Sequence, residues 1–233
     1  MRVRLLTGVL ALSFAPSMLL HAGREAGTFQ NPLIAGNLAD PAVMRHEGVY
    51  YLYATGEVDG DNGTRVYTSK DLIDWKRGPV VFRPGRPHVW APDVWRDPGS
   101  GKFYLYYTVN LTVGVAQADG PTGPFTEVKK FFDQAIDAHL FRDEDGKLYL
   151  YYVQFPGFRI KVQPMAGPTE PAGDSKLVLQ PEAEWEKRAG HVTEGPWMIK
   201  RQGRYYLLYS ASGADTRSEE HTSELQSRIT ISY

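Results

Sequence analysis

A short pattern occurs four times along the chain: an acidic residue, an apolar run, a polar turn, and then an aromatic-rich segment. The acids are Asp40, Asp93, Asp137 and Glu194, and the tyrosines at matching places are Tyr51, Tyr104, Tyr149 and Tyr206. Each acid precedes its tyrosine by 11 or 12 residues, and successive tyrosines are 53, 45 and 57 residues apart. Repeats of about 40–50 residues built from strands are typical of a β-propeller, in which each repeat forms one four-stranded blade. The sequence therefore predicts an all-β chain with the β-propeller fold.

The repeat also predicts where the four acids lie. In a β-propeller the first strand of each blade lines the central axis, so equivalent residues of successive blades converge although they are far apart in sequence. We expect the four carboxylates to meet at one end of that axis. Tyrosine-rich strands separated by clusters of Gly and Pro account for about three complete blades and the first half of a fourth.

Composition limits the classes of partner. The chain has 233 residues, of which 42% are hydrophobic, and a formal net charge of −1 at pH 7. That length and apolar content suffice for one globular domain, and the charge gives no electrostatic reason to expect nucleic acid or a membrane as partner. There is no cysteine, which excludes disulfides and thiolate metal sites.

Residues 1–22 have the pattern of a secretory signal peptide. Arg2 and Arg4 supply positive charge, residues 5–20 form an apolar stretch, and Ala22 is a small residue suited to cleavage. A membrane anchor is the alternative, but Pro16 and the shortness of the apolar run disfavour a stable membrane span. The predicted location is therefore secreted or periplasmic.

Residues 217–233 do not continue the repeat. From Arg217 to Ser227 the chain reads RSEEHTSELQS, which resembles a translated sequencing-adapter oligonucleotide. We therefore expect the propeller domain to occupy residues 23–216, and the natural protein to continue past about Thr216 with the rest of the fourth blade. An ordinary polar tail is the alternative.

Carboxylates grouped in an axial pocket are suited to the cleavage of a glycosidic bond. One must be ionised to activate water, and another must be protonated to donate to the leaving oxygen. In an inverting enzyme the two lie about 6.5–9.5 Å apart. A third carboxylate close to the acid raises its pKa, because like charges disfavour ionisation. A single acid is more often a turn or cap residue, whereas four at matching places favour the functional interpretation.

Particular blocks of sequence surround these acids. They are Asn31-Pro-Leu-Ile with Ala39-Asp-Pro41, Trp90-Ala-Pro-Asp93, Ile136-Asp-Ala-His-Leu-Phe141 and Thr193-Glu-Gly-Pro196. In this order they resemble the signature blocks of glycoside hydrolase family 43, and the segments 69–75 and 119–125 resemble the hairpins at that family's blade ends. The resemblance covers about residues 31–213. It implies a five-bladed propeller of inverting enzymes that act mainly on arabinose- and xylose-containing plant polysaccharides and oligosaccharides.

The resemblance also implies roles for individual residues. Asp40 matches the general base that activates water, Glu194 the general acid, and Asp137 the carboxylate that tunes the pKa of the acid and orients it. Asp93 matches no catalytic role, and we expect it to be structural or to contact sugar at the rim of the pocket. Asp137 is followed by the pair Ala138–His139 where a Pro-Ser-like pair is common, a local change that leaves the acid in place.

Aromatic side chains near these blocks are candidates for binding substrate, because the apolar faces of sugar rings stack on aromatic rings. Trp90 is the first candidate, with Phe155 and Trp197 behind it. For Trp75 and Trp185 we favour packing within the hairpins.

No metal site and no required cofactor are predicted. His88, His139 and His191 lie near the blocks without the spacing of a ligand pair, so we interpret them as hydrogen-bonding neighbours. The resemblance allows a structural calcium ion in a full-length parent, near a histidine of the last blade that has no counterpart in this chain. The expected partners are arabinan, arabinoxylan and xylo-oligosaccharides.

The main interpretation is thus an exported glycosidase of α-L-arabinofuranosidase or β-xylosidase type, and two alternatives stand beside it. One is a sugar-binding propeller without catalysis, although a pure binder has no chemical reason to keep Asp40, Asp137 and Glu194 together. The other is an inactive, truncated fragment of the hydrolase. The preferred sugar and the choice between chain-end and internal cleavage depend on loops around the pocket mouth, which these patterns do not determine.

Overall fold

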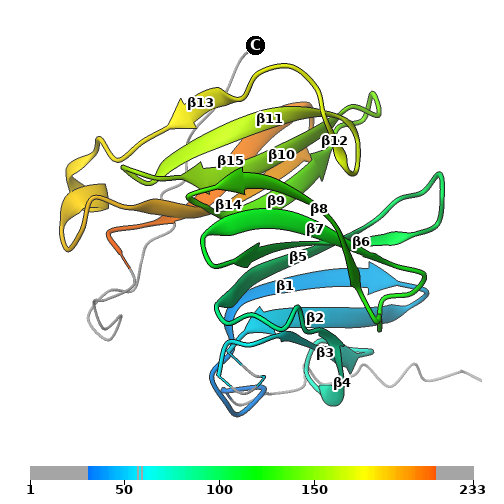
Figure 1. The fold of residues 1–233 in the computed structure, drawn as a ribbon. Coiled ribbons are helices and arrows are strands. Elements are labelled where there is room, and N and C mark those ends of the chain that lie inside the picture. Colours follow the sequence, from blue (N-terminus) through cyan, green and yellow to red (C-terminus); the bar gives the residue numbers. More distant parts are fainter. Residues whose placement is uncertain (1–30, 57, 59, 214–233) are drawn as a thin grey trace, which may run out of the picture. The chain divides into compact units, whose positions relative to one another are not determined.

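The structure is a computed structural model that describes residues 31–56, 58 and 60–213. The predicted signal peptide, residues 1–22, and the predicted adapter-like tail, residues 217–233, lie outside the described residues. Within the described part, regular structure is almost entirely strand, in four antiparallel sheets that follow one another along the chain (Figure 1). The prediction of an all-β chain is confirmed.

The first two sheets each contain four strands in sequence order. The first consists of β1 (Ala39–His46), β2 (Val49–Thr55), β3 (Thr64–Ser69) and β4 (Lys76–Phe82). The second consists of β5 (Val89–Arg96), β6 (Phe103–Val109), β7 (Thr112–Ala118) and β8 (Thr126–Asp133).

The third sheet follows the same plan with its outer strand broken in two. It consists of β9 (Ala135–Arg142), β10 (Leu148–Gln154), β11 (Arg159–Gly167), β12 (Glu170–Pro171) and β13 (Lys176–Leu179), and both short strands pair with β11. A linker with one turn of 3-10 helix, η1 (Glu184–Lys187), leads to the pair β14 (Thr193–Arg201) and β15 (Arg204–Ala211).

Position within a sheet determines the composition of each strand. The second strands, β6 and β10, have sheet neighbours on both sides and blades packed on both faces, and they read FYLYYTV and LYLYYVQ with few exposed residues. The fourth strands, β4 and β8, are edges, and they carry exposed lysines in KRGPVVF and TEVKKFFD. Charged edge strands discourage pairing with other chains.

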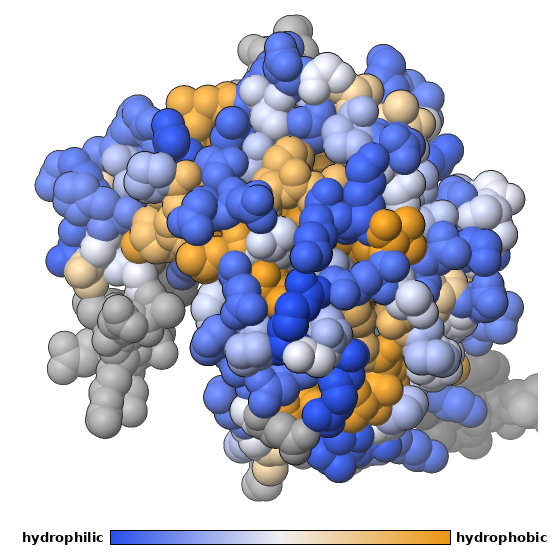
Figure 2. All heavy atoms as spheres, in the orientation of Figure 1, coloured by the Kyte–Doolittle hydropathy of each residue, from blue (hydrophilic) through white to orange (hydrophobic). Residues whose placement is uncertain are grey.

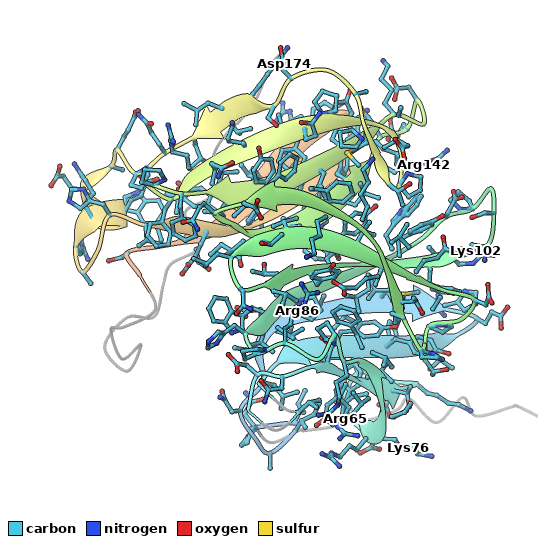
Figure 3. All side chains as sticks on the ribbon, in the orientation of Figure 1. Arg65, Lys76, Arg86, Lys102, Arg142 and Asp174 are labelled. Carbon is cyan, nitrogen blue, oxygen red and sulfur yellow. The ribbon has the colours of Figure 1, made fainter. Side chains whose placement is uncertain are left out.

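The first strands of successive sheets lie side by side: β1 against β5, β5 against β9, and β9 against β14 (Figure 1). This is the arrangement of blades around a propeller axis, and the propeller prediction is confirmed. Each inner strand begins at one end of the axis and ends at a turn at the other. Lys102 and Arg142 mark two of those turns, on the right of Figure 3.

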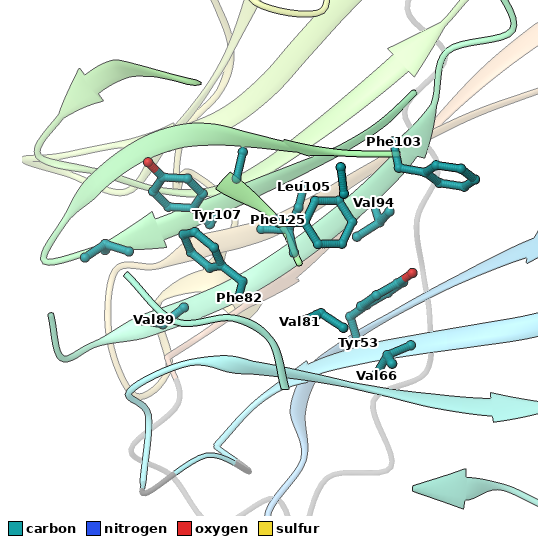
Figure 4. Close-up of a cluster of buried hydrophobic side chains, with 13 residues drawn as sticks. Tyr53, Val66, Val81, Phe82, Val89, Val94, Phe103, Leu105, Tyr107 and Phe125 are labelled. Carbon is teal, nitrogen blue, oxygen red and sulfur yellow. The ribbon is translucent and has the colours of Figure 1, made fainter. Parts of the chain in front are cut away.

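The hydrophobic core consists of three clusters, one at each junction between successive sheets. In the first, Tyr53, Val66 and Val81 of the first sheet pack against residues of the second that include Leu105 and Phe125 (Figure 4). Each sheet therefore buries its faces only against its neighbours, and stability depends on stacking, as in other repeat architectures.

Two buried tyrosines at equivalent places tie neighbouring sheets together. Tyr53 donates a hydrogen bond from its hydroxyl to the carbonyl oxygen of Pro121 at 2.6 Å. Tyr106 does the same to the carbonyl oxygen of Pro168 at 2.8 Å. In both cases the acceptor lies in a turn of the next sheet. Burial raises the pKa of both hydroxyls, so they remain protonated donors.

A charged group connects the third sheet to the fourth. Asp143, in the turn after β9, accepts hydrogen bonds from Lys200 at 2.7 Å and from the hydroxyl of Tyr205 at 2.5 Å. Partial removal from water opposes ionisation, but the bonds from Lys200 and Tyr205 outweigh it and lower the pKa of Asp143 to about 2.

The surface is predominantly polar, with apolar patches between the charged side chains (Figure 2). Large hydrophobic side chains that remain exposed include Val43 on β1 and Trp197 and Ile199 on β14. Among the described residues, no helix has the length and apolar character needed to cross a membrane.

Replacing Tyr106 with Phe tests the tyrosine connection. The change keeps the ring and leaves the Pro168 carbonyl without its donor, so we expect a loss of about 1–2 kcal/mol in the free energy of unfolding, measured by urea denaturation. Tyr50→Phe is the matched control, since no hydrogen bond to its hydroxyl is present in the described residues. Equal destabilisation by both changes would show that the hydroxyl of Tyr106 contributes nothing.

Asp143 should confer a dependence of stability on acid pH. Its pKa is lowered on folding, so its contribution is complete above about pH 4 and is lost as the pH falls from about 4 to about 2. The Asp143→Asn variant should therefore be less stable than the parent near neutral pH and should approach it at low pH. Thermal unfolding across this range tests this, with the exposed Asp74→Asn as control.

Candidate active site

Each inner strand contains an irregularity near its beginning, at the same place relative to its partner strand. The pairing of β1, β5, β9 and β14 shifts register between Ala39 and Ala42, Trp90 and Asp93, Ile136 and His139, and Glu194 and Trp197. One residue within each irregularity has a positive φ: 49° at Asp40, 44° at Ala91, 56° at Asp137 and 60° at Gly195. A bulge of this kind re-aims side chains and is frequent beside functional sites.

The bulges correct the predicted register of the acids. Asp40 and Asp137 both occupy the positive-φ position itself and so share one register. Glu194 lies one residue before that position, next to Gly195. Asp93 lies two residues beyond it, level with Ala42 and His139. The prediction that all four acids share one register was therefore wrong for Glu194 and Asp93.

The reason is the length of the turn that each spacing crossed. Tyr51, Tyr104, Tyr149 and Tyr206 do occupy equivalent places, and they pair with residues 7, 9, 8 and 7 positions earlier: Met44, Trp95, Phe141 and Ile199. The nearly constant distance from acid to tyrosine thus conceals turns of different length. Counting from the paired residue, the acids precede it by 4, 2, 4 and 5 positions.

A hydroxyl group connects the first bulge to the second. Thr55, at the end of β2, donates a hydrogen bond to Oδ2 of Asp40 at 2.8 Å, and it accepts one from the backbone N–H of Ala91 at 2.8 Å. The equivalent Thr108 accepts a hydrogen bond from the N–H of Asp137 at 3.1 Å. The bulge of one sheet is thus held by a hydroxyl from the sheet before it.

The third junction differs because Val153 stands where the first two sheets have a threonine. With no hydroxyl available there, the N–H of Gly195 donates to Oδ2 of Asp137 at 2.9 Å. This bond joins the peptide that follows Glu194 to the Asp137 carboxylate. One substitution in the repeat therefore brings a backbone donor onto a candidate catalytic acid.

Three carboxylates act on one another at this end of the axis. Burial raises the pKa of Asp137, the hydrogen bond from Gly195 lowers it, and the nearby charges of Asp40 and Glu194 raise it again, to about 7 overall. Like charges have such an effect only over short distances. The structure thus brings together the three acids for which the sequence predicted catalytic roles.

Asp93 has a different environment. It is buried, with 7% of its surface exposed. Its Oδ2 lies 3.1 Å from Nδ1 of His139 and accepts the N–H of Leu140 at 3.0 Å. Nε2 of His139 reaches the carbonyl oxygen of Met198 at 3.3 Å. The Asp93 carboxylate on β5 therefore holds β9 directly and, through His139, contributes to the link with β14.

The three aromatic candidates lie around this end of the axis with different exposure. Trp197 is 37% exposed and stacks on the His139 ring with centroids 4.2 Å apart. Trp90 and Phe155 are half-buried against the third core cluster. Trp90 also donates from its indole N–H to Oδ2 of Asp61 at 2.7 Å, an oxygen that lies 2.9 Å from Nδ1 of His88.

Thr55, Thr108 and Asp61 were missed in the sequence. A signal for the threonines was present, because a hydroxyl residue stands four positions after the repeat tyrosine in three of four repeats, with Ser210 as the third. No comparable signal marks Asp61, which lies in a loop between strands and reaches Trp90 only through the fold.

The described residues, 31–56, 58 and 60–213, contain no set of side chains placed to bind a metal ion. No group of three or more His, Cys, Asp or Glu side chains in this part is placed to share an ion. His88 and His139 each bond to an aspartate instead. The calcium ion allowed by the sequence resemblance stays a prediction for a longer protein.

The fold and this group of acids define the class of protein: a β-propeller with an acidic axial site of the kind that glycoside hydrolysis needs. Residues 29–230 match the family model described as Glycosyl hydrolases family 43. The chain belongs to this family, and the assignment made from its signature blocks is confirmed.

Relatives within the family differ in substrate. A β-D-galactofuranosidase of Aspergillus niger is 30% identical over 210 residues, which are 78% of this chain and 59% of that protein. An extracellular exo-α-(1→5)-L-arabinofuranosidase of Streptomyces chartreusis is 30% identical, covering 88% and 69%. The solved structure of an endo-1,4-β-xylanase of Bacteroides thetaiotaomicron is 36% identical with a TM-score of 0.69, covering 75% and 63%. The chain thus spans less than two thirds of the galactofuranosidase and of the xylanase.

Asp137→Asn should stabilise the protein at alkaline pH. The Asp137 carboxyl has a raised pKa when folded, so its folded form holds a proton between about pH 4 and pH 7 that the unfolded form has released. Its contribution to stability therefore falls as the pH rises through that window. Asparagine keeps an acceptor for Gly195 without the charge. We expect a gain on the order of 1–3 kcal/mol near pH 8 and little difference near pH 4.

Urea denaturation at the two pH values gives the measurement. Asp174→Asn is the control, because that aspartate is exposed and lies between the outer strands β12 and β13 (Figure 3). If the difference in free energy of unfolding between the Asp137 variant and the parent is the same at pH 8 and at pH 4, the carboxyl is not buried among like charges.

Proposed function

We propose that the protein hydrolyses O-glycosidic bonds of arabinose- or xylose-containing polysaccharides and oligosaccharides with inversion at the anomeric carbon. The observation that carries the proposal is the carboxyl of Asp137, whose pKa is raised to about 7 by burial and, to a smaller extent, by the nearby charges of Asp40 and Glu194. An inverting mechanism needs one proton for the leaving oxygen and one negative charge to activate water, and a carboxyl with this pKa can keep a proton among neighbouring carboxylates near neutral pH.

Asp40 is the proposed general base. Thr55 donates to Oδ2 of Asp40, and the described residues offer no hydrogen bond to Oδ1, so that oxygen is available to accept a proton from water. Asp40 is also exposed, which gives water access. The N–H of Ala91 fixes the direction of the Thr55 hydroxyl and so the direction of the carboxylate.

Glu194 is the proposed general acid, and Asp137 the residue that orients it and keeps a proton nearby. The Gly195 N–H bond to Asp137 sets the position of the backbone that carries Glu194. The strand of Glu194 is also anchored at its first residue, because Thr193 donates from its hydroxyl to the carbonyl oxygen of Phe158 at 2.6 Å. Trp90, Phe155 and Trp197 are proposed to bind sugar rings, as their positions around the site support.

The choice between arabinose and xylose rests on the relatives, whose names include an arabinofuranosidase and a xylanase. Galactofuranosides enter as a further candidate through the Aspergillus niger relative. Arabinofuranosides and galactofuranosides share a five-membered ring, so furanosides are the first class to try.

Export is part of the proposal. The support is the arrangement of charge, apolar stretch and small residue in residues 1–22, together with an extracellular relative. Expression in a bacterial host, followed by mass determination of the periplasmic protein, should show loss of these residues. An unprocessed, cell-associated product would contradict export.

Glu194→Gln tests the mechanism. On unmodified xylo- or arabino-oligosaccharides, whose leaving oxygen needs a proton, the kcat of this variant should be about 10²–10⁴-fold below that of the parent. With dinitrophenyl glycosides, whose leaving group departs without protonation, the loss should be much smaller. Asp40→Asn should lower kcat to the same extent on both kinds of substrate, because water must be activated in each case. Proton NMR of the first-formed sugar should show the inverted anomer.

Glu47→Gln is the matched control for the charge change, since Glu47 lies in the β1–β2 turn at the other end of β1. Unchanged turnover in the Glu194 variant would show that another group is the acid. A protein that binds the oligosaccharides but cleaves none would favour the binding propeller over the hydrolase.

A further inference from the structure

A pocket lies beside the candidate active site. Its volume is about 350 Å³, and it is lined by Pro156, Gly157, Arg159, Gln180, Pro181 and His191. These residues come from the β10–β11 turn, the beginning of β11, the end of β13 and the linker before β14. The volume is at the lower end of the range for small-molecule sites in proteins.

Arg159 is the distinctive group in this pocket. Its Nε is buried and has no hydrogen-bond partner in the described residues. The Arg159 side chain lines the pocket and brings a positive charge to it, so a ligand that supplies a negatively charged acceptor suits the pocket. Gly157 lies beside Arg159 with a φ of +95°, a backbone conformation that favours glycine in this turn.

The other polar groups of the pocket are also suited to an acceptor. Gln180 and His191 carry N–H donors, and no acidic side chain lines the pocket. Two acids of the adjoining linker bond away from the pocket, Glu184 to Lys187 and Glu186 to Tyr209, whereas Glu182 accepts one N–H of the Gln180 amide, which carries a second N–H. The net charge of the chain is −1, so attraction of an anion must come from this local group rather than from the whole protein.

The walls of the pocket are held in place before any ligand binds. Ile160 pairs with Leu179 in the sheet, which places Gln180 next to Arg159. The buried carboxylate of Glu186 accepts the backbone N–H groups of Glu182 and Ala183 at 2.7 Å each, which secures the linker. Fixed walls reduce the entropy lost on binding.

The pocket is close to the candidate acid. His191 precedes Glu194 by three residues, so their Cα atoms are at most about 11 Å apart. The bond from Thr193 to the carbonyl of Phe158 joins the strand of Glu194 to the turn that forms the pocket. A molecule in the pocket would thus adjoin a sugar whose bond is being cleaved.

We propose that this pocket binds the carboxylate of a uronic-acid residue carried by the polysaccharide, with the Arg159 guanidinium as its main partner. A planar guanidinium pairs with a carboxylate through two parallel hydrogen bonds. A neutral sugar offers no carboxylate for this pairing. The identity of the ligand as a sugar rests on the proposed function. The pocket would make acid-decorated chains preferred over neutral ones.

Binding of two small glycosides tests the proposal without hydrolysis. Methyl β-glucuronoside and methyl β-glucoside have the same ring and differ in the carboxylate, and NMR titration gives their dissociation constants. We expect the glucuronoside to bind more tightly, and Arg159→Gln to weaken it about ten-fold or more without affecting the glucoside. Arg188→Gln removes an equal charge from the same linker outside the pocket and should change nothing.

His191→Gln keeps the test valid if the Arg159 variant folds poorly, because His191 is exposed and its change should weaken the glucuronoside several-fold. Equal affinity for both glycosides, or an unchanged affinity in both variants, would overturn the proposal. Tight binding of a glucose sulfate would show a general anion site and also overturn it.

Failure of the proposed function gives a different result. A protein that binds the glucuronoside through Arg159 but cleaves no oligosaccharide would contradict the hydrolase and leave the pocket assignment standing. A protein that cleaves neutral oligosaccharides and ignores the carboxylate would contradict only the pocket assignment.

Discussion

The site depends on how one backbone N–H is satisfied in each of the inner strands β5, β9 and β14. A bulge with positive φ turns this N–H toward the preceding sheet, where it finds an acceptor. At the first two junctions the acceptor is a threonine hydroxyl, Thr55 or Thr108. At the third, Val153 offers none, and the N–H of Gly195 bonds to the carboxylate of Asp137. The same structural requirement thus produces plain support at two junctions and a positioned acid at the third.

Charge at the axis opposes stability, and charge at the periphery supports it. Asp137 is held where ionisation is unfavourable, among the carboxylates of Asp40 and Glu194. Asp143, at the other end of β9, is held where ionisation is favoured by Lys200 and Tyr205. Both lie on one inner strand or its turn, so this strand carries opposite electrostatic effects at its two ends. Storing an unfavourable charge at a functional site requires compensation elsewhere, and here the packed junctions between sheets supply it.

The register of the acids shows how far repeat spacing can be used. The tyrosines were placed correctly, because they lie within continuous strands whose period of two is regular. Asp93 was placed two positions off because the hairpin between β5 and β6 is two residues longer than that between β1 and β2: Tyr104 pairs with a residue nine positions earlier, and Tyr51 with one seven positions earlier. From its true position Asp93 supports His139 and Leu140 beneath the site. Asp61 was not foreseen at all, since a loop residue meets Trp90 only after two sheets have stacked.

The sequence by itself determined the all-β class, the repeat and its stacking order, the family, and the three acids of the candidate site. These follow from local composition, periodicity and signature blocks, which can be recognised from the order of the residues alone. Only the tertiary structure decided that Glu194 lies one position before the positive-φ residue of its bulge, that Gly195 bonds to Asp137, and that Arg159 lines a pocket. Those features arise where different sheets meet, and the energy of a buried donor or charge depends on neighbours that no single segment specifies.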